Sequence, residues 1–165
     1  MKIIHTIFTL LIAFSFQISF ADDQAILTVT GNITKTNQPD KKSFVFSFDE
    51  LNKLSNTVVR TQTIWTPTSD FKGSLIRDIL SAVGANPDAK NVEVRTEHNY
   101  VVTIPISDFK QWEVILAYSQ NGQRLTKMTK GPLWVIYPID QYKSELNNNL
   151  TRTKFAWNVK KIVVN

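Results

Sequence analysis

The sequence predicts an α+β domain built from mixed β-sheets and few short helices. Most apolar residues fall in short runs rich in β-branched and aromatic side chains, which is typical of strands. Only one stretch, Leu75–Val83, repeats apolar residues at a clear helical spacing. The 165 residues contain no internal repeat and no shift in composition, so we expect a single domain.

A signal peptide is expected before that domain, over residues 1–21. Lys2 supplies a positive charge, Ile7–Phe16 forms an apolar run, and Ser19-Phe20-Ala21 places small residues where a signal peptidase cleaves. The run is shorter than the roughly 20 residues that span a bilayer, although a retained anchor stays as the alternative. The domain then covers residues 22–165, and its expected location is the periplasm.

The first part of the domain predicts strands at Ile26–Thr30, Phe44–Phe48 and Val58–Trp65. Ser47 and Glu50 have the spacing of a capping box, which begins a short helix that runs through Leu54. Phe46 and Leu51 are spaced as the hydrophobic staple of the same helix.

A second helix follows, with Ser74 as its candidate N-cap and Gly84 as its stop. Its apolar stripe consists of Leu75, Ile76, Ile79, Leu80 and Val83. Val92–Thr96 and Tyr100–Ile104 then predict a β-hairpin, with His98-Asn99 at its tip.

The last part of the chain predicts a short turn or helix from Ser107 to Phe109. Further strands are expected at Glu113–Tyr118, Leu133–Tyr137 and Trp157–Val164. Asn121-Gly122 is a strong tight-turn signal. Leu133–Tyr137 is almost wholly apolar and is therefore expected to be a central strand, whereas the polar segment Tyr142–Thr153 is expected to be a surface loop.

The composition excludes several kinds of site. The chain has no cysteine, which excludes disulfides, thiolate metal ligands and cysteine nucleophiles. His5 and His98 are the only histidines, so neither a structural zinc site nor a Ser-His-Asp triad is expected. Five glycines do not supply a Gly-rich phosphate loop. We therefore predict no catalytic residue and no metal ligand.

The net charge is +5 at pH 7, and basic residues concentrate late in the chain. These residues are Arg124, Lys127, Lys130, Arg152, Lys154, Lys160 and Lys161. They form either a solvated basic face or the rim of a pocket that attracts an anion. Nucleic acid is not an expected partner for an exported protein.

Several short motifs occur in an order that resembles one family. Phe71–Leu80 is similar to an aromatic-x-Gly-x-x-Leu pattern, and His98-Asn99-Tyr100 is similar to a hairpin tip that Ile104-Pro105 follows. Asn121–Pro138 contains a Gly-x-x-Leu, a Gly-Pro and a closing Pro, and Trp157–Ile162 is similar to a closing strand. Over residues 25–164 this order resembles the sulfite oxidase-type molybdopterin-binding fold.

The resemblance implies a site without its metal anchor. Thr61 stands where members of the family carry the cysteine that binds molybdenum, and a hydroxyl does not supply a thiolate. The signal also lacks an arginine pair, so the chain is expected to cross the membrane unfolded and to meet its ligand afterwards. Small, cysteine-free exported relatives of this fold bind a reduced pterin and signal to a membrane-bound cyclic-dinucleotide enzyme. The resemblance therefore implies a pterin ligand, such a membrane partner and no molybdenum cofactor.

Seven residues are candidates for contacting this ligand. Trp65 can cover the flat ring, Arg60 can pair with a carbonyl oxygen, and Lys130 precedes the Gly-Pro at the expected pocket mouth. In the family the hairpin tip faces the cofactor. The candidates are Arg60, Thr61, Trp65, His98, Asn99, Tyr100 and Lys130. Structural roles stay open for several of them, in particular a core position for Trp65 and packing for Tyr100.

Three functions are consistent with these observations. The first is a periplasmic pterin-binding sensory module that acts on a membrane signalling protein. The alternative is a periplasmic molybdopterin-dependent oxidoreductase that binds its metal without cysteine. The third is a plain interaction module whose pocket is closed by Trp65 and Tyr100.

Overall fold

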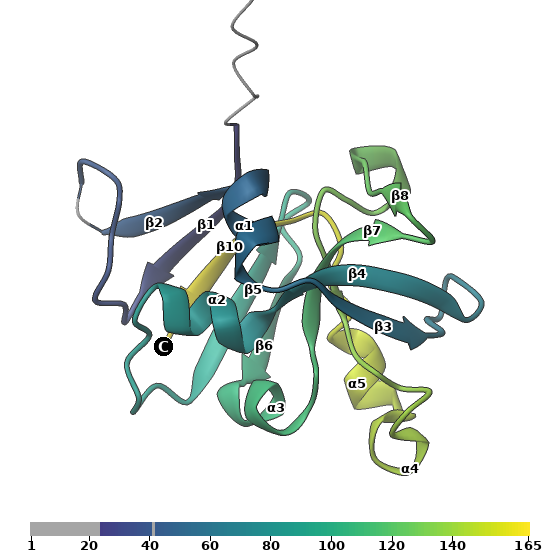
Figure 1. The fold of residues 1–165 in the computed structure, drawn as a ribbon. Coiled ribbons are helices and arrows are strands. Elements are labelled where there is room, and N and C mark those ends of the chain that lie inside the picture. Colours follow the sequence, from purple (N-terminus) through teal and green to yellow (C-terminus); the bar gives the residue numbers. More distant parts are fainter. Residues whose placement is uncertain (1–23, 41) are drawn as a thin grey trace, which may run out of the picture.

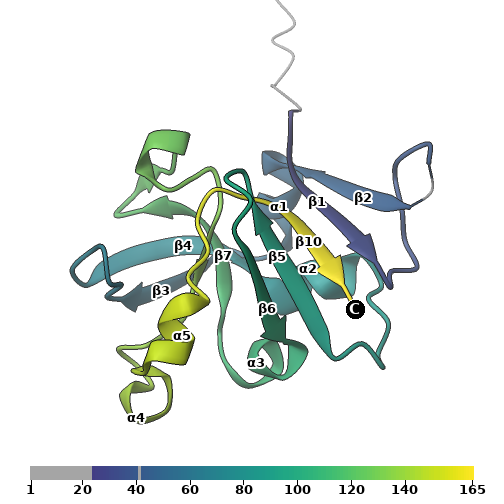
Figure 2. The same ribbon diagram turned by 180° about the vertical axis from the view of Figure 1, so that it is seen from behind.

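A computed structural model describes residues 24–40 and 42–165, so the signal peptide expected over residues 1–21 lies outside the described residues. The chain forms two β-sheets that lie side by side, with short helices around them (Figures 1 and 2). This confirms the predicted α+β class with mixed sheets and few short helices. No described helix has both the length and the apolar character needed to cross a membrane.

The first sheet has five strands, in the order β2 (Ser43–Ser47), β1 (Ala25–Gly31), β10 (Val159–Val164), β5 (Asn91–Thr96) and β6 (Val101–Pro105). It is mixed, because β1 and β10 run parallel while the other neighbours are antiparallel. The second sheet is antiparallel and consists of β3 (Thr57–Thr61), β4 (Ser69–Leu75), β7 (Ile115–Gln120) and β8 (Gln123–Arg124), with β9 (Trp134–Ile136) paired to β7.

The helices are short. They are α1 (Phe48–Leu54), α2 (Ile76–Ala82), α3 (Ile106–Gln111), α4 (Lys143–Leu146) and α5 (Asn149–Thr153), together with a 3-10 helix η1 (Lys127–Thr129). The capping box predicted for α1 is confirmed: the Ser47 hydroxyl accepts from the Glu50 N–H, and the Glu50 carboxylate accepts from the Ser47 N–H at 2.8 Å. These two bonds satisfy backbone groups in the first turn of α1, and Leu51 is the helix residue that is buried in the core.

The hairpin and turn predictions are also confirmed. β5 and β6 pair around the tip at His98-Asn99, where Asn99 has a φ of +64°. β7 and β8 turn through Asn121 and Gly122, both with positive φ, as a tight Asn-Gly turn requires.

Two predictions in the region of β3 and β4 are wrong. The expected strand Val58–Trp65 ends at Thr61, so Trp65 lies in a loop and not on a strand. Residues Ser69–Leu75 form β4, and α2 begins only at Ile76, without a side-chain cap. The Ser74 hydroxyl donates instead to the Leu51 carbonyl at 2.7 Å. Pairing with β3 and β7 on both sides determines the conformation of β4, and this tertiary effect leaves little local signal.

Two predictions in the last third also need correction. The expected surface loop Tyr142–Thr153 contains α4 and α5, and the Asn148 side chain caps α5 by accepting from the Thr151 N–H at 2.9 Å. The expected central strand at Leu133–Tyr137 is β9, which pairs with β7 alone among the named strands of the described chain. Its burial arises because Trp134 also bridges to Trp157 and packs into the core.

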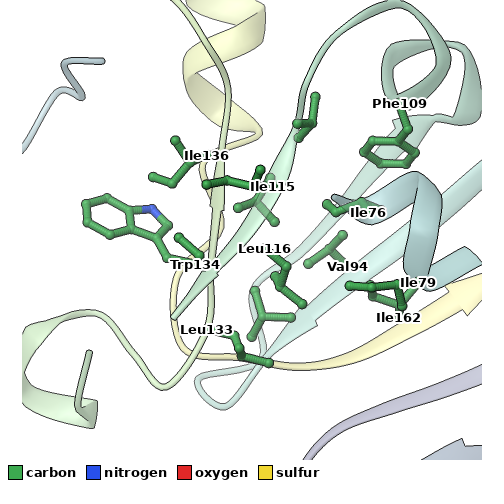
Figure 3. Packing of buried hydrophobic residues seen from close by; sticks show 14 of the residues in the cluster. Ile76, Ile79, Val94, Phe109, Ile115, Leu116, Leu133, Trp134, Ile136 and Ile162 are labelled. Atoms are coloured by element: carbon green, nitrogen blue, oxygen red, sulfur yellow. The ribbon is translucent and has the colours of Figure 1, made fainter. Parts of the chain in front are cut away.

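The core is one continuous cluster that both sheets and α2 share. Figure 3 shows Ile76 and Ile79 of α2 against Val94 and Ile162 of the first sheet, with Leu116 of the second sheet beside them. Because both sheets contribute to a single cluster, they form one domain with a shared core.

Gly73 is a point where the two backbones of β4 and β7 approach too closely for a side chain. A Cβ there would lie 2.3 Å from the Leu116 carbonyl oxygen, at a register shift between Lys72 and Gly73. We expect Gly73→Ala to lower the free energy of unfolding by roughly 3 kcal/mol, the upper part of the range for overpacking, in a urea titration. Gly122→Ala is the control, since nothing lies within 4 Å of its added Cβ. It should cost only about 1 kcal/mol for its positive φ, and equal losses would contradict the argument.

Candidate ligand-binding site

A cavity of about 490 Å³ opens where the loop after β3, the β5–β6 hairpin and the segment from α5 to β10 meet. Figures 1 and 2 both place α5 at the same end of the molecule as β3. The cavity is lined by Ile64, Trp65, Thr96, His98, Tyr100, Arg152, Thr153, Phe155 and Trp157. Its volume is in the range that holds one small heterocyclic ligand.

The walls of this aromatic cavity are mainly flat rings. Trp65 and Tyr100 are 44% and 47% exposed, which is unusual for large aromatic side chains. The rings of His98 and Trp157 lie 6.1 Å apart at their centres. The Tyr100 hydroxyl donates to the Thr153 carbonyl at 2.7 Å and so ties the hairpin to α5. The cavity therefore presents several ring faces that are available for stacking.

Arg152 supplies the one permanent charge among the residues that line the cavity. Its guanidinium donates to the Asn147 side-chain oxygen at 2.8 Å, which orients it and leaves further N–H groups for a ligand. A smaller cavity of about 240 Å³ shares Ile64, Arg152 and Phe155 with the first and is otherwise more polar. The guanidinium thus stands where an apolar space meets a polar one.

A buried polar cluster holds α5 in place beside the cavity. The Lys154 ammonium lies 2.7 Å from the Asp108 carboxylate of α3, and the Tyr137 hydroxyl donates to the same oxygen at 2.8 Å. Burial, and then the charge and hydrogen bond of Asp108, raise the pKa of Tyr137 well above its usual value. Because Lys154 directly follows Thr153, this cluster fixes the two α5 residues that line the cavity.

Comparison with known proteins adds the family. The sequence matches the family described as the oxidoreductase molybdopterin binding domain over residues 27–141. The chain belongs to this family. The fold is similar to the crystal structure of the sulfane dehydrogenase SoxCD from Paracoccus pantotrophus, with a TM-score of 0.62 and 15% identity. The match covers 89% of this chain and 39% of that one, so the chain spans well under half of its structural relative. No curated protein matches the chain.

This membership confirms the resemblance drawn from the ordered motifs and the sulfite oxidase-type molybdopterin-binding fold it implies. At 15% identity the likeness to SoxCD establishes the fold alone. The family's description concerns molybdopterin binding, so the question for this chain is which parts of such a ligand its residues can hold.

The molybdopterin-binding family member described here lacks the donors for a thiolate-bound metal. Thr61, at the position expected for the cysteine, is fully buried, and its hydroxyl accepts from the Asp140 N–H at 3.2 Å and donates to the Gln62 carbonyl at 3.3 Å. It lines neither cavity. Over residues 24–40 and 42–165 no three His, Asp or Glu side chains gather as a metal site would require. The chain therefore offers no thiolate to a metal, and Thr61 lies apart from the residues that line the aromatic cavity.

The cavity brings together three of the seven candidate residues, namely Trp65, His98 and Tyr100. Trp65 is not a core residue, since nearly half of its surface is exposed.

The other four candidates lie outside the cavity. Arg60 forms an exposed ion pair with Asp70 at 2.9 Å. Asn99 occupies the left-handed turn position of the hairpin, and Lys130 adopts a φ of +68° with its ammonium 5.7 Å from the Trp134 ring. Thr61 has the structural role described above.

Six lining residues were not among the candidates. They are Ile64, Thr96, Arg152, Thr153, Phe155 and Trp157. Arg152 and Thr153 were missed because their segment was expected to be a surface loop. The sequence indicated only that Arg152 is a basic residue in a polar stretch. Its position at the cavity follows from the helical conformation of α5.

Proposed function

We propose that this chain is a periplasmic pterin-binding protein that carries no molybdenum and serves as a sensory module for a membrane signalling protein, such as a cyclic-dinucleotide enzyme. The observation that carries the proposal is the ring-lined cavity on a molybdopterin-binding fold whose chain has no cysteine. The expected ligand is a reduced pterin.

The chemistry of the cavity suits a pterin. A pterin is a flat heterocycle with apolar faces and an edge of hydrogen-bond donors and acceptors. Trp65 and Trp157 offer faces for stacking, and the Arg152 guanidinium offers a planar set of donors for a carbonyl oxygen and ring nitrogen. The Thr96 hydroxyl donates to no described group but accepts from the Tyr100 N–H at 3.1 Å, so its proton is available at the cavity wall.

The residues that line the cavity suit binding better than catalysis, which supports a sensory role. His98 is the one histidine that lines it, and neither a carboxylate nor a nucleophile with a partnered base is among the lining residues. Binding and redox discrimination need only shape and hydrogen bonds, and a reduced pterin differs from an oxidised one in both planarity and N–H pattern. A membrane partner can then respond to the occupied form.

The test is to purify the protein from its natural source, extract its small molecules and measure its metals. Bound pterin without molybdenum, together with calorimetric binding of added tetrahydropterin, is the expected result. Stoichiometric molybdenum would instead support a molybdopterin-dependent oxidoreductase, which the family membership also allows. If the protein contains neither pterin nor molybdenum and binds its partner equally well without ligand, the result would support the plain interaction module.

Trp65→Ala should weaken pterin binding with little loss of stability. An aromatic stack contributes about 0.5–1.5 kcal/mol beyond area burial, so the dissociation constant should rise roughly two- to tenfold. Because the ring is 44% exposed, the free energy of unfolding should change by less than about 1 kcal/mol. Calorimetry and thermal melting measure the two effects.

Trp112→Ala is the control for the binding measurement, because Trp112 packs on Tyr142 and lies outside the cavity. It should leave pterin affinity unchanged. A collapsed melting temperature for Trp65→Ala, or equal binding losses in the two variants, would remove Trp65 from the site.

A further inference from the structure

A second cleft, of about 410 Å³, lies between the start of β1, the β8–η1 segment and the start of β10. Its walls include Ile26, Leu27, Glu97, Arg124, Lys127 and Lys160. We call it the basic cleft. None of its lining residues belongs to the aromatic cavity, so it is a separate feature of the surface.

The basic cleft exists because β1 and β10 separate at one end. Their parallel pairing begins at Thr28 and Lys161, so residues 24–27 have no strand on the β10 side within the described chain. β10 is diverted there by Asn158, whose φ is +52°, and by a register shift between Val159 and Lys161. The result is a slot along one side of an extended backbone.

The Arg124 side chain is stacked on an aromatic ring. Its guanidinium carbon lies 3.9 Å above the centre of the Phe48 ring, which covers one face of the planar group. Over residues 24–40 and 42–165 its side chain has neither a hydrogen-bond nor an ion-pair partner. A stacked guanidinium with free N–H groups is the arrangement that suits bidentate binding of a carboxylate.

The remaining charges of the cleft are also positive on balance. Lys160 is exposed and forms no ion pair with any described residue. Lys127 and Glu97 form a pair at 3.0 Å, which neutralises one cation and one anion. Among the described residues, Arg124 and Lys160 are thus the two charges of the cleft without an ion-pair partner.

We propose that the basic cleft docks an extended, acidic segment of a partner protein. The two free cations provide charge complementarity, and the side of β1 at residues 24–27 provides backbone groups that an added strand can pair with. A compact inorganic anion would use the cations but not the slot. This inference does not depend on which ligand the aromatic cavity takes.

The cleft adjoins the aromatic cavity through two short segments. Glu97 lines the cleft and the next residue, His98, lines the cavity. Trp157 lines the cavity and Val159 lines the cleft, and Asn158 between them accepts from the Glu97 N–H at 2.9 Å. A segment docked in the cleft therefore touches the same hairpin that forms one wall of the cavity.

The experiment measures fluorescence anisotropy of a labelled octapeptide of alternating Asp and Val with the purified protein at physiological ionic strength. The matched probe has Asn in place of every Asp. We expect the acidic peptide to bind at least tenfold more tightly than the Asn peptide, and Arg124→Gln and Lys160→Gln each to weaken it several-fold. Arg77→Gln, which removes the same charge from an exposed site on α2, should change the affinity less than twofold.

Thermal melting of each variant verifies that it is folded, which is expected because all three side chains are exposed. Equal binding of the two peptides would overturn the proposal, because the acidic side chains would then contribute nothing. An equal effect of Arg77→Gln and Arg124→Gln would overturn it in favour of general charge attraction. Displacement of the peptide by inorganic phosphate at millimolar concentration would overturn it in favour of a small-anion site. Pterin titrations of the same variants test the aromatic cavity separately, because none of the three substituted residues lines it.

Discussion

Asp108→Ala should lower the free energy of unfolding by about 3–5 kcal/mol, because it leaves a buried ammonium group without its counter-charge. The side chains of Lys154 and Asp108 are only 11% and 16% exposed, and the Tyr137 hydroxyl shares the carboxylate. Removing the carboxylate leaves both the Lys154 ammonium and the Tyr137 hydroxyl without their partner. Chemical denaturation followed by tryptophan fluorescence measures the loss.

The exposed pair of Arg60 and Asp70 is the matched control. Its atoms are 2.9 Å apart, yet the two side chains are 69% and 51% exposed. Asp70→Ala should therefore cost no more than about 1 kcal/mol. If the two aspartate variants lost equal stability, the buried cluster would not have the anchoring role given to it here.

The cluster also supports the residues of α5 that line the aromatic cavity. Lys154 follows Arg152 and Thr153 in the chain, and its ion pair fastens the end of α5 to α3. Lys154→Met, which keeps the length of the side chain and removes its charge, should preserve more stability than Asp108→Ala, because Tyr137 still donates to Asp108.

Local signals in the sequence predicted the elements whose conformation is decided locally. Ser47 and Glu50 satisfy each other's backbone groups within four residues, and the Asn121-Gly122 turn needs only its own two positive φ angles. β4 was missed because Lys72 and Gly73 interrupt its apolar pattern, while two neighbouring strands supply its hydrogen bonds. Glycine at position 73 is explained only by the approach of β7.

For the candidate site, the family resemblance supplied three of the residues that line the aromatic cavity. Trp65, His98 and Tyr100 were named from motif positions, and they do meet at one cavity. Arg152 and Phe155 reach the same cavity through the packing of α5, which depends on an ion pair across 46 positions of sequence. No periodic pattern encodes a contact of that kind, so six of the nine residues that line the cavity were absent from the sequence-based candidates.

Trp134→Ala should also lower the free energy of unfolding by about 3–5 kcal/mol, the usual cost of emptying a large aromatic site in a core. Trp134 is fully buried, and the edge of its ring lies against Phe71 with the ring centres 5.3 Å apart. Figure 3 shows its indole at the margin of the core cluster, beyond Ile115 and Leu116. The Trp65 ring lies 6.0 Å away on the cavity side, so the two tryptophans are neighbours with opposite expected roles.

Comparison of three variants separates those roles. Trp134→Phe should cost far less stability than Trp134→Ala, since the indole N–H has no hydrogen-bond partner in the described part of the chain and its loss removes an unsatisfied polar group. Trp65→Ala should weaken the ligand and spare the fold, whereas Trp134→Ala should destabilise the fold first. Denaturation curves and pterin titrations on the same preparations distinguish the two. If Trp134→Ala were as stable as Trp65→Ala, Trp134 would not contribute to the core, and the core role given to it would be wrong.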